Sequence, residues 1–288
     1  MNSTAAPHGK SLHPHRLFTF FKWTIYLLLL GNTLYFLQED LLSLTALYEG
    51  QVTWGNVAQV FSAFMDTLGW LILLLVFEFE TAIIPDEYLH GPLNWLLLAI
   101  KVICYFFIVS AFFGYIAEYM TFQDILEFGS ANVCELAGQG WNYVLWLDEY
   151  PVLDATACLS LQGQELFRVA GSELIGTADA IAHAQRLTII DVINAGTWLV
   201  IVALLEVEVR LQINETLTDR TIQLLAWSKG FFYLLLVVCA IWWMVDGEFV
   251  DYWDAILWLV AFIFIELNIF QWHEEVDSHI HQQTSELE

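Results

Sequence analysis

The sequence predicts an all-α integral membrane protein whose six transmembrane helices form three repeated two-helix hairpins. The 288 residues are 58% apolar, 16% aromatic and 15% charged. Six apolar runs are each about twenty residues or more, the length needed to cross a bilayer core. They cover residues 17–37, 58–83, 93–119, 188–211, 224–245 and 249–272. Two recurring motifs, one for each alternate run, indicate the hairpin repeat.

The first motif occurs in the second, fourth and sixth runs. It has the form [D/N]-x3-W-x7-E-x-[E/N] and occupies residues 66–80, 194–208 and 254–268 at identical spacing. Membrane helices favour Trp near the interfaces and acids near their ends, which explains the residue types but not the constant spacing. Its polar positions are Asp66, Glu78 and Glu80; Asn194, Glu206 and Glu208; Asp254, Glu266 and Asn268.

The second motif, K-x3-Y, occurs in the first, third and fifth runs. The chain has only four lysines, and three of them belong to this motif. The two motifs alternate along the chain, an order that is hard to obtain by chance. The pairs are Lys22 and Tyr26, Lys101 and Tyr105, and Lys229 and Tyr233.

The chain divides into segments at these spans. Residues 1–16 form a tail, 17–119 contain the first hairpin and the third span, 189–272 contain spans four to six, and 273–288 form an acidic tail. Residues 38–57 are expected to connect the first two spans, with LLSLTALY as a helix lying at the membrane interface.

Residues 120–188 form the one large soluble insertion, within the second hairpin. Their pattern predicts a helical, extracytoplasmic unit. Cys134 and Cys158 are expected to form a disulfide there, because the compartment outside the membrane is oxidising. The alternative is two buried free thiols, which becomes the better interpretation if the topology is inverted.

Basic residues set the predicted orientation. Lys10 and Arg16 precede the first span, and Arg210 and Arg220 lie between the fourth and fifth spans. The positive-inside rule then places both termini in the cytoplasm, and a bacterial inner membrane is the default location. The net charge of -24 excludes a nucleic-acid partner and is compatible with attraction of cations, although an acidic, salt-adapted proteome would also produce it.

The three motif lysines are predicted to share one layer of the bundle with three glutamates. At about 1.5 Å per residue the lysines lie about 6–8 Å from the span centres, level with Glu78, Glu206 and Glu266. An unpaired charge there costs at least about 2.5–3.5 kcal/mol, so one Lys–Glu pair per hairpin is expected. Each motif tyrosine can donate a hydrogen bond to the same carboxylate. Glu80, Glu208 and Asn268 are expected to face the opposite side and reach the headgroups.

This charged layer has two interpretations. It can line an ion pathway, or it can be a polar clamp that aligns the hairpins. The clamp is favoured because equal numbers of opposite charges cancel. The layer of Asp66, Asn194 and Asp254 has no repeated basic partner and is the better candidate for cation coordination. Asp66 favours this functional interpretation, whereas Asp254, near the start of its span, favours helix capping.

Several classes of protein lack support in the sequence. All eight histidines are expected in tails or loops, which excludes bis-His haem and most intramembrane metal sites. His13, His15, His279 and His281 could bind a metal together, but solvated tails are expected. No phosphate loop, hydrolase or metalloprotease motif occurs, so no enzyme, cofactor or metal site is predicted.

The sequence therefore favours an ion-conducting membrane protein, channel or transporter, selective for cations. The alternative is a non-catalytic subunit or scaffold of a larger membrane complex. A lipid-modifying enzyme is the third hypothesis, and it lacks a catalytic cluster. The expected partners are the lipid bilayer and either further copies of the chain or other membrane subunits.

Overall fold

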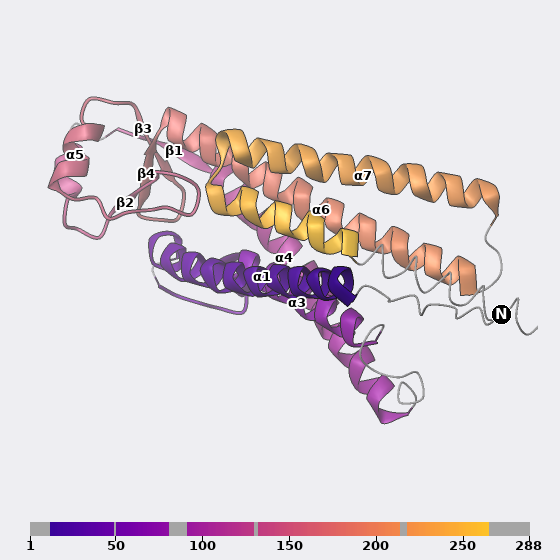
Figure 1. The fold of residues 1–288 in the computed structure, drawn as a ribbon. Helices are drawn as coiled ribbons and strands as arrows, with labels where there is room; N and C mark the ends of the chain where they lie inside the picture. The colour runs from indigo at the N-terminus through magenta and orange to yellow at the C-terminus, as the bar shows by residue number, and fades with distance from the viewer. Residues whose placement is uncertain (1–11, 49, 81–90, 130–131, 214–217, 265–288) are drawn as a thin grey trace, which may run out of the picture.

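The computed structural model describes residues 12–48, 50–80, 91–129, 132–213 and 218–264. Long helices pack side by side into a bundle, and a small sheet-containing unit lies at one end of it (Figure 1). Outside the described residues lie residues 1–11 of the tail predicted at 1–16, the whole tail predicted at 273–288, and Glu266 and Asn268; residues 12–16 of the first tail are helical instead.

The first helix is longer than predicted. α1 runs from Leu12 to Leu47 without interruption. The expected connection at 38–57 is therefore wrong over its first ten residues, because QEDLLSLTAL contains no Gly or Pro to end the helix. A short turn leads to α2 (Val57–Val60) and α3 (Ser62–Glu78), and residues 79–80 continue α3 as a π-helical turn.

Three more long helices and one shorter helix complete the bundle. α4 covers Pro92–Gln123, α6 covers Ala178–Ile213 and α7 covers Asp219–Asp246. Residues 249–264 are also helical. α3 packs against both α1 and α4, and α6 packs against both α4 and α7.

The insertion is not the helical unit that the sequence predicted. It contains a four-stranded sheet in the order β1-β3-β4-β2, in which only the β2–β4 pair is parallel. The strands are too short for a reliable alternation pattern, and β1 pairs with a strand about forty residues away, so local periodicity could not reveal them. The elements are β1 (Ile125–Phe128), η3 (Val133–Leu136), β2 (Asn142–Tyr143), α5 (Ala155–Leu161), β3 (Leu166–Val169) and β4 (Leu174–Thr177).

The predicted disulfide is confirmed. Cys134 in η3 is bonded to Cys158 in α5, whereas Cys104 and Cys239 are buried free cysteines within the long helices. The bond connects two short elements that pack over a small core of their own, which includes Leu153 and Ile175.

The prediction of a membrane protein with transmembrane helices agrees with the structure. Four helices are long and apolar enough to cross a membrane: Phe18–Leu47, Pro92–Gln123, Ala178–Glu208 and Arg220–Asp246. Their outer faces expose large apolar side chains such as Leu27, Phe106 and Leu234, which a water-soluble surface of this extent rarely carries. α3 and the helix at 249–264 are not among these four, so six spans and the hairpin repeat stay predictions.

Candidate functional site

A cavity of about 110 Å3 lies inside the bundle, next to the insertion. Side chains from seven helices and from the insertion line it. Its dominant feature is acidity, because nine carboxylates face it: Glu39, Asp40, Asp66, Glu118, Asp148, Asp191, Glu248, Asp251 and Asp254. No Lys, Arg or His is among the described residues that line the cavity.

The nine carboxylates cannot all be ionised without counter-charges. At an effective dielectric constant of about 20, two like charges about 6 Å apart repel by about 3 kcal/mol. Several such pairs would exceed the stability of an ordinary domain. Closely spaced acids of this kind therefore favour protonation or the presence of counter-ions.

Three of these carboxylates accept well-formed hydrogen bonds. The indole nitrogen of Trp70 donates to Asp66 across 2.9 Å, and the amide of Asn32 donates to Asp254 across 2.8 Å. The backbone N–H of Phe64, in the first turn of α3, donates to Asp40 across 3.0 Å. These neutral donors orient the acids without neutralising their charge.

The structure brings together the predicted layer of Asp66, Asn194 and Asp254. All three line the cavity, although they come from three different helices. The tryptophans four residues further on, Trp70, Trp198 and Trp258, are buried in one apolar cluster. The rings of Trp70 and Trp198 are 6.4 Å apart, so the motif tryptophans form the floor beneath the acidic residues.

One predicted Lys–Glu pair is present as expected. Lys22 on α1 forms a buried ion pair with Glu78 on α3. The hydroxyl of Tyr26 donates to the other oxygen of the same carboxylate at 3.3 Å. Asp66 and Glu78 are twelve residues apart on α3, so this pair lies about 18 Å along the helix from the acidic layer.

The other two motif lysines bind different glutamates from those expected. Lys101 on α4 contacts Glu80 across 2.6 Å, and Lys229 on α7 contacts Glu208 across 2.8 Å. Glu80 and Glu208 therefore form ion pairs with neighbouring helices, which the sequence did not predict, and their approach to the headgroups stays a prediction. The reason is that α3 lies between α1 and α4, so carboxylates two residues apart reach lysines on opposite neighbours.

Glu206 and Tyr105 do not join a buried layer of charges. Glu206 pairs with Arg210 one turn later on α6, and the two side chains are 56% and 73% exposed. Tyr105 is exposed on α4, and Tyr233 is half-buried on α7. Glu266, the third glutamate of this predicted layer, lies outside the described residues.

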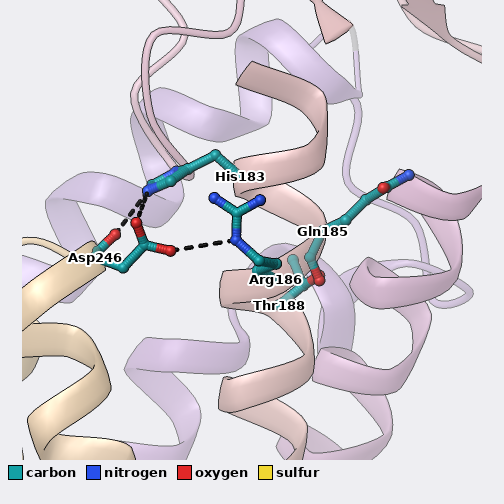
Figure 2. A network of polar contacts seen from close by, with 5 residues as sticks. All are labelled: His183, Gln185, Arg186, Thr188 and Asp246. Atoms are coloured by element: carbon teal, nitrogen blue, oxygen red, sulfur yellow. Dashed lines mark hydrogen bonds and ion pairs between the residues drawn. The ribbon is translucent and has the colours of Figure 1, made fainter. Parts of the chain in front are cut away.

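A polar cluster joins the start of α6 to the end of α7. The Nε2 atom of His183 lies 2.6 Å from the carbonyl oxygen of Asp246, whose carboxylate also contacts Arg186 at 3.3 Å (Figure 2). His183 is thus part of a long apolar helix. The expectation that every histidine lies in a tail or loop is wrong here, because α6 begins ten residues before the predicted span.

Among the described residues that line the cavity, Asp148 is the acid that comes from the insertion. It has a backbone φ of +65°, a left-handed conformation that Asp tolerates better than most residues. Burial raises the pKa of its carboxyl to about 6, and the nearby Glu248 adds to this rise. Burial likewise raises the pKa of Glu248.

Sequence reasoning missed most of the acids that line the cavity. Glu118 and Asp191 are single acids within apolar helices, a signal that could have identified them. Asp148 has no such signal, because only the fold of the insertion brings it to the bundle. In the described part of the chain, no group of three or more His, Cys, Asp or Glu residues is arranged to hold a metal ion.

Compared with protein-family models, with curated proteins and with solved structures, the chain matches none.

Proposed function

We propose that the protein moves cations across the membrane and that the acid-lined cavity is the site at which they bind. The observation that supports this is the convergence of nine carboxylates on one cavity, with no basic side chain among its described lining residues. Acids exposed to an interior cavity of a membrane protein mark ion or proton pathways.

The chemistry of the cavity favours small cations. Carboxylates, the amide of Asn194 and the hydroxyls of Ser43 and Thr67 are oxygen donors, which hard cations prefer. Protons are the other candidate, because closely spaced carboxylates share them readily. An anion would meet only repulsion from these walls.

The proposed arrangement has six spans, with α3 and the helix at 249–264 crossing the membrane beside the four longer helices. Both termini are then cytoplasmic, and the cavity lies toward the outer face, beneath the insertion. A bacterial inner membrane is the proposed location. In this arrangement Lys22 and Glu78 form a neutral clamp near the inner face, because their charges cancel.

Reconstitution into liposomes tests this proposal. Purified protein should dissipate a gradient of Na+, K+ or protons while leaving chloride behind. The double variant Asp66→Asn with Asp254→Asn removes two of the cavity carboxylates and should slow the cation flux by tenfold or more. The control is Glu165→Gln, which removes an exposed carboxylate of the insertion. Folded protein that passes no cation under any gradient would refute the proposal.

The scaffold hypothesis predicts a different outcome. A non-catalytic subunit would co-purify in mild detergent with other proteins at fixed stoichiometry, and native mass spectrometry would identify them. A homo-oligomer would instead support conduction, because further copies of the chain are the proposed partners.

A further inference from the structure

One hairpin of the insertion reaches into the bundle. Residues 141–153 form a two-stranded ribbon: the N–H of Tyr143 donates to Pro151 at 3.1 Å, and that of Leu145 donates to Glu149 at 3.1 Å. Its tip is the turn Trp146–Glu149, closed by backbone hydrogen bonds between these two residues. The left-handed backbone of Asp148 makes this tight turn possible.

The tip forms part of the wall of the acidic cavity. The tip contributes Leu147 and Asp148 to the lining of the cavity. Leu147 is buried in the apolar cluster that includes Leu187 of α6 and Trp243 of α7. The backbone carbonyl of Asp148 accepts a hydrogen bond from the hydroxyl of Ser43 on α1, with 3.4 Å between the oxygens.

A second contact holds the tip from outside the cavity. The ring of Trp146 packs edge-on against His183, with 4.8 Å between ring centres and an angle of 74°. His183 is itself fixed to Asp246 at the end of α7, and Arg186 holds the carboxylate of Asp246 (Figure 2). The ring of Trp146 is partly exposed, so this contact lies at the rim.

The tip has few contacts with the bundle. A long 3.4 Å hydrogen bond, one buried leucine and one aromatic pair hold it, whereas each helix packs along its length. The carboxylate of Asp148 also lies near those of Glu248 and Asp251, and like charges oppose the closed position.

We propose that the tip Trp146–Glu149 is a plug that closes the acidic cavity on the side of the insertion, and that cations reach the cavity when the tip withdraws. The inference rests on the proposed function, because it assigns a gate to the same site. In this proposal the contact between Trp146 and His183, called the latch, holds the tip in place, and Leu147 and Asp148 occupy the opening of the cavity.

Reaction of a reporter cysteine with a cationic thiol reagent tests the plug without any transport assay. Asn194→Cys places the thiol on the cavity wall, and a trimethylammonium-ethyl methanethiosulfonate adds a mass that mass spectrometry follows in detergent. The protein without the reporter is the blank, since Cys104 and Cys239 are buried. With the plug in place, the reporter should react slowly.

Removing the latch should accelerate the reaction. Trp146→Ala is expected to raise the rate about tenfold, which corresponds to about 1.4 kcal/mol, the magnitude of one aromatic pair. His183→Ala removes the same contact from the other side and should act similarly, which guards against misfolding of one variant. Trp146→Phe retains a ring and should stay close to the parent rate. Leu145→Ala, an exposed residue beside the tip, is the matched control.

Two results would overturn the plug. One is a reporter that already reacts at the rate of an exposed thiol in the parent. The other is equal rates for the Trp146→Ala, His183→Ala and Leu145→Ala variants. A reporter cysteine that reacts faster in the latch variants, in a protein that passes no cation in liposomes, would support the plug and reject the proposed transport.

Discussion

Replacing Glu78 by Gln removes the negative partner of a buried ion pair while keeping the shape of the side chain. The side chains of Lys22 and Glu78 are only 10% and 4% exposed. Glu78→Gln therefore leaves a lysine charge buried without a counter-charge. Breaking a buried pair from one side costs about 3–5 kcal/mol, so we expect the free energy of unfolding to fall by about 3 kcal/mol.

Glu206 offers a matched control, because it occupies the same position of the repeated motif as Glu78. Its pair with Arg210 is more than half exposed and spans one turn of α6. Exposed pairs of this kind contribute about 0.3–0.5 kcal/mol. Glu206→Gln should therefore change the stability by no more than about 0.5 kcal/mol.

The assay is unfolding in mixed detergent micelles with increasing sodium dodecyl sulfate, monitored by tryptophan fluorescence. The double variant Lys22→Met with Glu78→Gln should recover most of the loss, since replacing both charges of a buried pair by neutral side chains is often harmless. Equal losses for Glu78→Gln and Glu206→Gln would refute the reasoning, because they would show that burial does not distinguish the two pairs.

Four further predictions concern the insertion and the helices. Replacing Cys134 and Cys158 by Ala should destabilise the insertion by about 3 kcal/mol, because the disulfide closes a loop of 24 residues, and faster proteolysis of the insertion would reveal it. Gly114→Ala should destabilise the bundle by at least about 2 kcal/mol, because its added Cβ would lie 2.1 Å from a backbone oxygen of α2. Gly31→Ala should instead stabilise α1 by about 0.5–1 kcal/mol in the same unfolding assay, because no atom lies within 4 Å of the added Cβ. The pKa of the Asp148 carboxyl is raised from 3.8 to about 6, so the folded state holds this proton more tightly than the unfolded state. The free energy of unfolding should therefore fall as the pH rises from about 4 to about 6. Equal pH dependence of unfolding in the wild type and in Asp148→Asn would contradict this.

Local patterns in the sequence were sufficient for several features. Apolar runs predicted the long helices, because length and hydropathy are properties of a single segment. The spacing of the motif placed Asp66, Asn194 and Asp254 at one level, and all three line the same cavity. Two cysteines in one polar insertion predicted the disulfide that the structure contains.

The choice of partners depended on the packing of the helices. The sequence identified three lysines that need a carboxylate, but each helix offers acids on more than one face. Only the position of α3 between α1 and α4 assigns Glu78 to Lys22 and Glu80 to Lys101. Glu206, identical to Glu78 in its motif, forms an exposed pair instead.

The sequence by itself determined that this chain has apolar helices that suit a membrane, three lysines among them and a disulfide-bonded insertion. Those features follow from the composition and spacing of contiguous residues. The acidic cavity was decided by the tertiary structure alone. It joins Glu118, Asp148 and Asp191 to the motif residues, and these acids come from segments whose proximity depends on helix packing and on non-local strand pairing. Charge repulsion among such acids acts only once the fold brings them together.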